Sequence, residues 1–311
     1  MTDHLKLLQS SVDLRYESPT YRALGYSFVI RCDDAALADY LASLFQQFQS
    51  RGPAQSVYTF CAIEDAGKPN YLLYCDDKMV DNHRRPAVPF ATLLWHINRS
   101  VVRSSQDRVL IHASAVARGG VALLFPAAME SGKTTLAAGL VREGFDYITD
   151  ETVAIDPMTG DVEPFPRALS VDEGSWDVLA GLRPEVPPGA EKYVGRQWQV
   201  PPSSIRPGSV SGRTYPRFII TPSYVPGGST ELVQIGRAEG VLILAEHSFN
   251  FARHGATGLR ILAQVARRSV CYRLQVSDLA RACSLVQGLV DGDLMDLSGD
   301  GATGQEEGSR G

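Results

Sequence analysis

The sequence predicts an α/β protein with a phosphate-binding loop in its main domain and an additional α+β region before it. Three observations lead to this prediction. Short apolar runs alternate with amphipathic helical runs along most of the 311 residues. A Gly-Gly turn joins two apolar runs, 108–117 and 121–127, as is typical of a β-hairpin. The second run leads directly into the sequence SGKTT (131–135), which opens a helical stretch.

Residues 1–95 are expected to form an N-terminal α+β region with an accessory or substrate-recognition role. It contains no spacing typical of a catalytic motif. The pattern predicts strands over 26–32, 56–63, 71–75 and 78–81, and one amphipathic helix over 35–48.

Residues 96–297 are expected to form the phosphate-loop domain, with a mixed sheet in which the hairpin 108–127 is central. Helices are predicted over 86–105, 134–143, 238–248, 256–267 and 276–290, and further strands over 145–149, 152–156, 217–221, 230–235 and 269–274. Residues 157–214 are rich in Pro and Gly and read as loops, and so long a stretch of loops inside a domain is more often functional than filler. Residues 298–311 are rich in Gly and charge and predict a disordered tail.

The composition excludes several classes of protein. A net charge of -5 gives no global reason to expect a nucleic acid or an anionic membrane as partner. The five cysteines are scattered and form no CxxC pair, which favours reduced thiols over disulfides or zinc. The first residues lack the order of a signal peptide, and no apolar run approaches the ~18 residues of a membrane span. We therefore expect a cytoplasmic protein.

The stretch 121–136 has the order strand, loop, helix that a phosphate-binding loop requires. Backbone N–H groups and the positive end of the helix would hold the phosphates of ATP, Lys133 would reach the β and γ oxygens, and the Thr134 hydroxyl would coordinate Mg²⁺. We expect Lys133 to be exposed when nucleotide is absent. The residues predicted to contact ATP are Met129, Glu130, Ser131, Gly132, Lys133, Thr134 and Thr135.

Ala127 occupies the position at which the full phosphate-loop pattern has its first glycine. Alanine resists positive φ and carries a Cβ atom near the phosphates, so weaker binding or a reshaped loop is expected.

Two adjacent acids, Asp150 and Glu151, follow the short apolar strand after the phosphate-loop helix. They read either as a solvated turn or as a functional pair, in which one carboxylate holds the metal and the other takes the proton from an attacking hydroxyl. His112 lies in an otherwise small and apolar strand, and that pattern by itself favours a hydrogen-bonded core histidine.

The order of these features resembles the HPr kinase/phosphorylase family, particularly the smaller bacterial HPr-kinase-like proteins of biosynthetic gene clusters. The shared order is His-x-Ser in a strand (His112 and Ser114), a Gly turn, a strand, the phosphate loop, and an apolar strand that ends in paired acids and Val (150–153). The resemblance covers 108–156 strongly and extends weakly to the last helix.

This resemblance implies a phosphate-loop kinase core of the HPr kinase type that phosphorylates a hydroxyl with ATP and Mg²⁺. It implies that Asp150 is the general base, that Glu151 is a Mg²⁺ ligand or the partner of one, and that His112 is a polar residue beside the γ-phosphate. The acceptor would be a hydroxyl-bearing peptide, protein or small molecule. Cores of this family often associate, so a homo-oligomer is a further expectation. Glu151 stands where the family has a second aspartate, and the long loop that engages the family's protein substrate has no counterpart here.

A kinase is not the only function that fits the sequence. The protein could instead be a non-catalytic module in which ATP orders the 157–214 segment around a partner, and Ala127 is the residue that favours the module. A phosphoenolpyruvate-carboxykinase-like transfer would need a metal-binding His/Lys set that the sequence lacks. Lys192 and Arg196 either supply positive charge over the transferring phosphoryl group or belong to a solvated loop.

Overall fold

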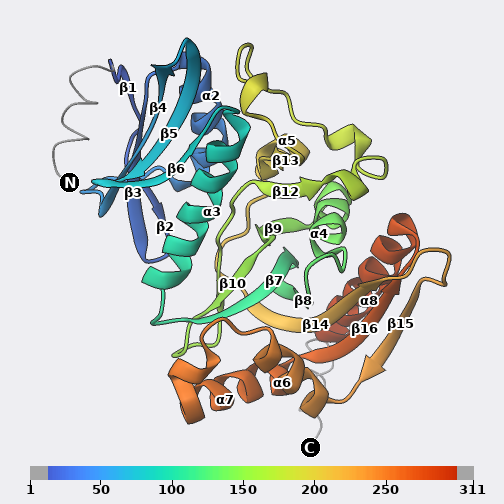
Figure 1. Ribbon diagram of the computed structural model, residues 1–311. Coiled ribbons are helices and arrows are strands. Elements are labelled where there is room, and N and C mark those ends of the chain that lie inside the picture. Colours follow the sequence, from blue (N-terminus) through green and yellow to red (C-terminus); the bar gives the residue numbers. More distant parts are fainter. Residues whose placement is uncertain (1–12, 300–311) are drawn as a thin grey trace, which may run out of the picture.

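The computed structural model describes residues 13–299 and is a mixed α/β fold with two large sheets (Figure 1). The N-terminal third of the chain forms the first sheet, and the remainder forms the second sheet with its helices. A small two-stranded sheet, β12 (Leu169–Asp172) with β13 (Gln197–Val200), lies in the segment between them in sequence.

The first sheet has six strands in the order β1-β3-β4-β5-β6, with β2 beside β3. Its strands are β1 (Tyr16–Glu17), β2 (Tyr21–Ala23), β3 (Tyr26–Cys32), β4 (Ser56–Asp65), β5 (Lys68–Cys75) and β6 (Lys78–His83). Two helices, α2 (Ala35–Phe45) and α3 (Ala87–Ser104), pack against it, and a 3-10 turn (Gln46–Phe48) follows α2. Asp34 caps α2 by accepting hydrogen bonds from two backbone N–H groups of its first turn, which explains why the helix begins there.

The second sheet has eight strands in the order β11-β10-β7-β8-β14-β16-β15, with β9 also paired to β7. Its strands are β7 (Val109–Arg118), β8 (Val121–Pro126), β9 (Asp146–Thr149), β10 (Thr152–Ile155), β11 (Val162–Glu163), β14 (Tyr215–Tyr224), β15 (Glu231–Ile235) and β16 (Val270–Val276). The predicted hairpin is confirmed as the antiparallel pair β7–β8 near the centre of the sheet. Strands β8, β14 and β16 are parallel to one another, so the sheet is mixed, as predicted.

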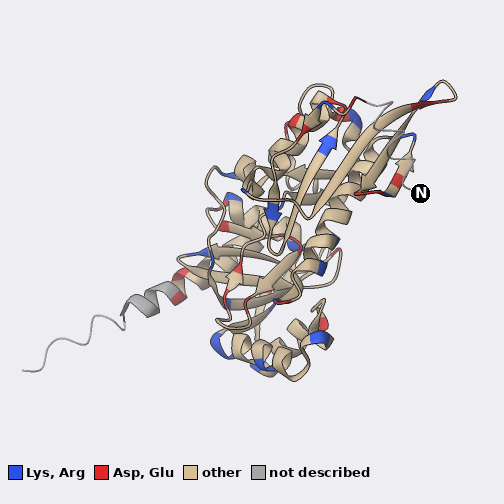
Figure 2. Cartoon of the chain, turned by 90° about the vertical axis from the view of Figure 1, so that its left-hand side faces the viewer, with Lys and Arg blue, Asp and Glu red and all other residues tan. Residues whose placement is uncertain are grey.

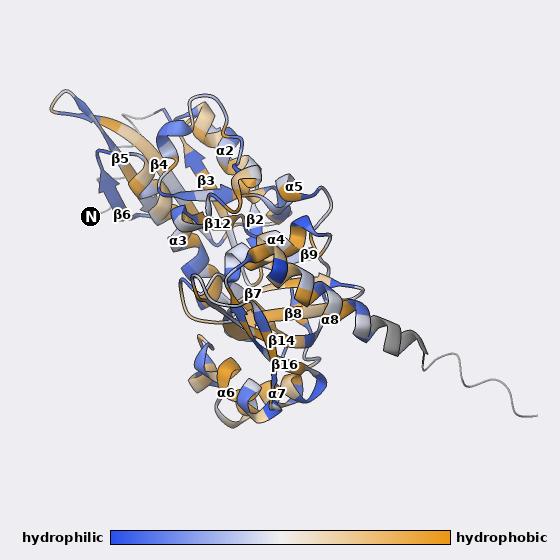
Figure 3. Cartoon of the chain, turned by 90° about the vertical axis from the view of Figure 1, so that its right-hand side faces the viewer, coloured by the Kyte–Doolittle hydropathy of each residue, from blue (hydrophilic) through white to orange (hydrophobic). Residues whose placement is uncertain are grey.

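Helices cover both faces of this sheet. Helices α4 (Lys133–Arg142) and α8 (Leu279–Gly299) contribute to one buried cluster, and α6 (Arg237–Glu246) and α7 (Phe251–Arg268) contribute to the cluster on the other face. Figure 3 shows the corresponding hydrophobic colour along β8, β14 and β16 between these helices. α7 is kinked at Gly255, whose φ of 51° breaks the helical geometry.

Residues 157–214 contain more regular structure than the loops predicted from sequence. Besides β11, β12 and β13 they include α5 (Pro202–Ile205) and three 3-10 turns, Glu173–Ser175, Ala180–Leu182 and Glu191–Tyr193. Pairing of β12 with β13 joins segments far apart in sequence, and Pro and Gly content does not reveal such a pairing.

One short segment, 165–170, contacts both halves of the fold. Phe165 and Ala168 are buried in the hydrophobic cluster of the first sheet. Leu169 lies in the cluster between the second sheet, α4 and α8. The division of the chain at 95/96 remains a prediction. Helix α3 runs across that position, and four of its five buried residues belong to the first cluster.

At the C-terminus α8 continues to Gly299, beyond the predicted end at residue 290. Most of the predicted disordered tail, residues 300–311, lies outside the described residues. Figure 2 shows that basic and acidic residues are interspersed in both parts of the fold. None of the helices within residues 13–299 is both long and apolar enough to cross a membrane.

Candidate functional site

The predicted site residues meet at one edge of the second sheet. Strands β8 and β9 both pair antiparallel with β7, so they run in the same direction and end at the same edge. Strand β9 pairs with β7 at Ala115 and β10 pairs with it at His112. Asp150 and Glu151 lie between those two strands, and the Ala113 N–H donates to the Glu151 carbonyl at 3.3 Å. The two acids therefore follow the strand that ends beside the β8–α4 loop.

The β8–α4 loop, residues 127–132, has left-handed backbone at two positions. Glu130 has a φ of 63°, and Gly132, which caps α4, has a φ of 88°. Ala127 has no positive φ, so the strain expected there falls instead on Glu130. The Ser131 hydroxyl oxygen is buried and has no hydrogen-bond partner among the described residues. An unpaired buried hydroxyl in this loop fits contact with a polar ligand such as a phosphate oxygen.

Lys133 is the first residue of α4, and the expectation that it is exposed is wrong. The residue is only 6% exposed, because its Nζ folds back and donates to the Ala128 carbonyl at 2.6 Å. Burial lowers the pKa of this ammonium group, while the charges of Glu151 and Asp150 act in the opposite direction. The side chain therefore lies within electrostatic range of both acids.

Asp150 is almost fully buried, and its two carboxylate oxygens have separate partners. Tyr147 donates its hydroxyl hydrogen to Oδ1 at 3.1 Å, and the Ser170 backbone N–H donates to Oδ2 at 2.9 Å. The Arg167 guanidinium lies 3.6 Å from Oδ1. Burial, and next the charge of Asp150, raise the pKa of Tyr147 far above its usual range, so this hydroxyl stays protonated and donates.

Glu151 is more accessible than Asp150, with 35% of its side chain exposed. Its Oε1 lies 3.8 Å from His112 Nε2, and its Oε2 lies 3.5 Å from the Arg167 guanidinium. Burial raises the pKa of Glu151, and the charge of Asp150 raises it further, whereas Arg167 and Lys133 lower it. A carboxylate with a raised pKa and partial exposure is suited to accept a proton.

His112 is neutral at physiological pH. Burial, then the charge of Lys133 and then His247, lower its pKa to about 4. Its backbone N–H donates to the His247 carbonyl at 2.7 Å, and its ring lies 5.6 Å from the half-exposed Phe249 ring. The structure thus places His112 beside Glu151 rather than in an apolar core.

Ser114, two residues after His112, has a definite structural role. Its hydroxyl donates to the Lys133 carbonyl at 3.1 Å and so ties β7 to the first residue of α4.

Arg167 is the site residue that sequence reasoning missed. It lies in the Pro-rich segment, follows Pro166, and contacts both acids. Its guanidinium also donates to the Ser170 hydroxyl at 2.8 Å. The only available signal was a single arginine in a segment already expected to be functional.

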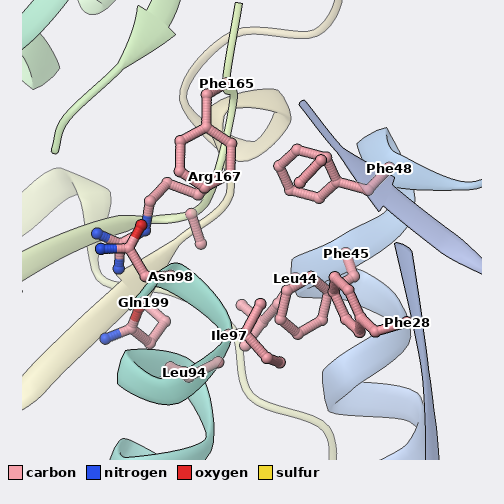
Figure 4. Close-up of a pocket in the computed structure, with 12 residues that line it drawn as sticks. Phe28, Leu44, Phe45, Phe48, Leu94, Ile97, Asn98, Phe165, Arg167 and Gln199 are labelled. Carbon is pink, nitrogen blue, oxygen red and sulfur yellow. The ribbon is translucent and has the colours of Figure 1, made fainter. Parts of the chain in front are cut away.

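A cavity of about 30 Å³ lies behind Arg167, between the first sheet and the 165–170 segment (Figure 4). Arg167, Asn98 and Gln199 gather at one side of it, and aromatic side chains including Phe28 and Phe48 form the other. This volume has room for about two water molecules. Asn98 Oδ1 is buried without a partner among residues 13–299, so water is the group that the cavity fits.

A larger pocket of about 290 Å³ opens at the N-terminus of α4. One end is lined by Gly132, Lys133, Thr134 and Thr135, which are residues predicted to bind ATP. The Thr135 hydroxyl lies 2.6 Å from the Ser175 hydroxyl, which connects α4 to the segment that forms one wall of the pocket.

Hydroxyl and carboxylate oxygens, which are typical Mg²⁺ ligands, lie near the N-terminus of α4. Within residues 13–299 no three His, Cys, Asp or Glu side chains cluster as a metal site by themselves. Mg²⁺ commonly binds through one or two carboxylates together with substrate phosphates, and this needs no such cluster. Thr134 lines the pocket, and Glu151 offers a partly exposed carboxylate near Lys133.

Of the two cations proposed for the loop over the site, Lys192 lies on the first sheet, whereas Arg196 lies near Glu173, the neighbour of the pocket residue Gly174. Lys192 Nζ pairs with Asp34 Oδ2 at 2.6 Å, at the N-terminus of α2. The Arg196 side chain is 91% exposed, and its nearest acid is Glu173 at 3.9 Å. Lys192 is therefore an anchor on the first sheet.

Comparison with known proteins gives only distant likenesses, among solved structures. No known family model matches the chain, and no curated protein matches it. Among solved structures it is similar to the Hpr(Ser) kinase/phosphatase from Coxiella burnetii, at 9% sequence identity and a TM-score of 0.35, over 62% of this chain and 95% of that chain. Because this likeness is so distant, the function has to be inferred from the site itself.

Proposed function

We propose that the protein is a phosphate-loop kinase that transfers the γ-phosphoryl group of Mg-ATP to a hydroxyl of a peptide, protein or small molecule. The observation that carries the proposal is the convergence of Lys133, Glu151 and His112 beside a loop that opens a helix at a sheet edge. Loop, lysine and carboxylate are the three parts that phosphoryl transfer requires.

The loop and the N-terminus of α4 would hold the phosphates, since free N–H groups and the helix dipole both favour anions there. Lys133 would leave the Ala128 carbonyl and contact the phosphate oxygens. Thr134 would hold Mg²⁺ together with the phosphate oxygens, and the bound ion would neutralise charge on the phosphates.

The acid pair would activate the acceptor. A carboxylate takes the hydroxyl proton as the acceptor oxygen bonds to the γ-phosphorus, and the bond from that phosphorus to the bridging oxygen breaks to release ADP. The sequence favoured Asp150 as this base. The contacts of the two side chains support Glu151 instead, because it is more exposed and lies beside His112, whereas the Asp150 oxygens are bound by Tyr147 and Ser170.

A second candidate function is a non-catalytic module that binds nucleotide and a partner. The engagement of both Asp150 oxygens within the protein favours it, since a carboxylate fixed in this way has less freedom to act on a substrate. Binding of ATP without phosphoryl transfer would be its signature.

Lys133→Met tests the proposal, because it keeps the aliphatic volume and removes the charge. Calorimetry with Mg-ATP should show binding to the wild type and a loss of about 100-fold or more in the variant, since a charge-assisted contact to phosphate is removed. Lys192→Met is the matched control, a paired lysine far from the loop, and should leave the affinity unchanged. Equal ATP affinity for Lys133→Met and the wild type would rule out the loop assignment.

Transfer itself is tested with γ-labelled ATP and degenerate peptide mixtures that contain Ser, Thr or Tyr as their only hydroxyl, with a set of polyols in parallel. Incorporation by the wild type and none by Lys133→Met supports the kinase. Binding without incorporation into any mixture supports the module.

A further inference from the structure

The 290 Å³ pocket also has an apolar end, which lies beside the loop. It is formed by Tyr224, Val178, Val276 and Leu279. Tyr224 is the last residue of β14 and Val276 the last of β16, and both strands are parallel to β8. This apolar end and the β8–α4 loop therefore lie at the same carboxyl edge of the sheet, where open α/β sheets bind their ligands.

Two of these side chains are unusually exposed for their size. Tyr224 is 55% exposed and Val178 is 53% exposed, although both line the pocket. They come from different parts of the fold, Tyr224 from β14 and Val178 from the segment after the 3-10 turn at 173–175. A flat apolar group between them would remove both from water.

The backbone that carries Tyr224 is fixed by hydrogen bonds. Tyr224 pairs with Val276 in register, and the next N–H, of Val225, donates to the Val276 carbonyl at 2.8 Å. The Tyr224 Cβ atom would lie 3.9 Å from a Cβ atom built on Gly132. The Cβ atom of Tyr224 is thus held beside the loop that the phosphates are proposed to occupy.

We propose that this end of the pocket binds the base of the nucleoside triphosphate, with one face of the base stacked on the Tyr224 ring and the other covered by Val178. The inference rests on the proposed function in one respect, that the phosphates lie in the β8–α4 loop. Stacking of a base on an aromatic side chain requires no base-edge hydrogen bonds.

Two ligands distinguish the contribution of the base to the affinity from that of the phosphates. Mg-ATP and inorganic triphosphate with Mg²⁺ share the phosphate chain, and only ATP carries a base. The wild type should bind ATP more tightly than triphosphate. Tyr224→Ala should weaken ATP by about 5- to 100-fold, as expected for loss of one stacked base, and leave triphosphate unchanged. Tyr224→Phe keeps the ring and should keep the affinity for ATP.

Tyr215→Ala is the matched control. Tyr215 is 41% exposed and begins the same strand at its opposite end, so its truncation should change neither ligand. The base site would be wrong if the wild type bound ATP no more tightly than triphosphate. It would also be wrong if Tyr224→Ala lowered the affinity for both ligands equally. Either result would leave the loop assignment intact. Failure of the wild type to bind either ligand would overturn the proposed function, and the base site with it.

Discussion

The Ser114 hydroxyl donates to the carbonyl of Lys133, so the central strand of the second sheet holds the first residue of α4 in place. Ser114→Ala removes this buried hydrogen bond and should cost about 1 kcal/mol of the free energy of unfolding. Because Lys133 follows the loop directly, the affinity for Mg-ATP should also fall. Ser269→Ala removes another buried serine bond, to the Val265 carbonyl at 2.8 Å, at the end of β16 opposite to the pocket. Denaturant unfolding should show similar losses for both variants, and only Ser114→Ala should lose affinity; equal affinities would contradict the positioning role.

Removing the charge of Glu151 and removing the charge of Asp150 should have different effects. Glu151→Gln should cut single-turnover transfer by about 10²- to 10⁴-fold, the usual effect of losing a general base. It should cause no loss of stability, because the raised pKa of Glu151 means that the folded protein disfavours the charged form of this side chain. Asp150→Asn leaves the guanidinium of Arg167 without one of its two acids and should destabilise the fold by about 3 kcal/mol. If Glu151→Gln transferred phosphate at a near-normal rate and a folded Asp150→Asn did not, Asp150 would be the general base.

The pH dependence of transfer gives a second readout for Glu151. Because its pKa is raised, the rate should increase with pH through a value above that of an ordinary glutamate. Arg167→Met removes a charge that lowers this pKa, so the rising limb should move to higher pH. If the rising part of the pH–rate profile stayed at the same pH in Arg167→Met, Glu151 would not be the titrating group.

His112 should make the protein less stable in mild acid. Its folded-state pKa of about 4 lies below the 6.5 of an unperturbed histidine, so the unfolded chain binds the proton more readily. This contribution is fully present above pH 6.5 and is lost as the pH falls towards 4, by at most about 3 kcal/mol. The raised pKa of Glu151 acts in the opposite sense and offsets part of it.

Urea unfolding at several pH values should show this loss in the wild type and a smaller loss in His112→Gln. Parallel pH profiles for the two proteins would mean that His112 is not buried in its neutral form.

Glycine should have opposite effects at two positions of the loop. Glu130→Gly relieves a left-handed residue at φ 63° and should raise the free energy of unfolding by about 1 kcal/mol. Ala127→Gly adds backbone freedom where φ is not positive and should lower it by about 0.5–1 kcal/mol, with ATP affinity unchanged. Thermal unfolding measures both, and stabilisation by glycine at 127 would contradict the backbone geometry.

Local patterns were enough to predict the hairpin and the helix that begins after the second strand. The Gly-Gly turn, the apolar runs and the SGKTT sequence each act over a few residues, and the strands and α4 lie close to where these patterns placed them. The burial of Lys133 depends on a bond to Ala128 that only the folded loop creates. Local sequence carries no sign of that bond.

Long-range contacts decided the rest. Arg167 contacts Asp150 two residues before β12, which pairs with β13 across a long Pro-rich segment. The sequence of β12 alone does not show which segment pairs with it. The partners of Asp150 include a backbone N–H at Ser170, which composition does not indicate. The relative roles of the two acids therefore required the structure.

The segment 165–170 has a consequence for how this chain can be divided or recombined. Phe165 and Ala168 sit in the core of the first sheet, and between them Arg167 reaches the acids. A shortened protein that starts after α3 would leave these side chains facing water and would release the guanidinium from its setting. The amino-terminal sheet is thus part of what holds Arg167 beside Asp150 and Glu151, and a foreign domain grafted in its place would have to bury Phe165 and Ala168 again to keep that arrangement.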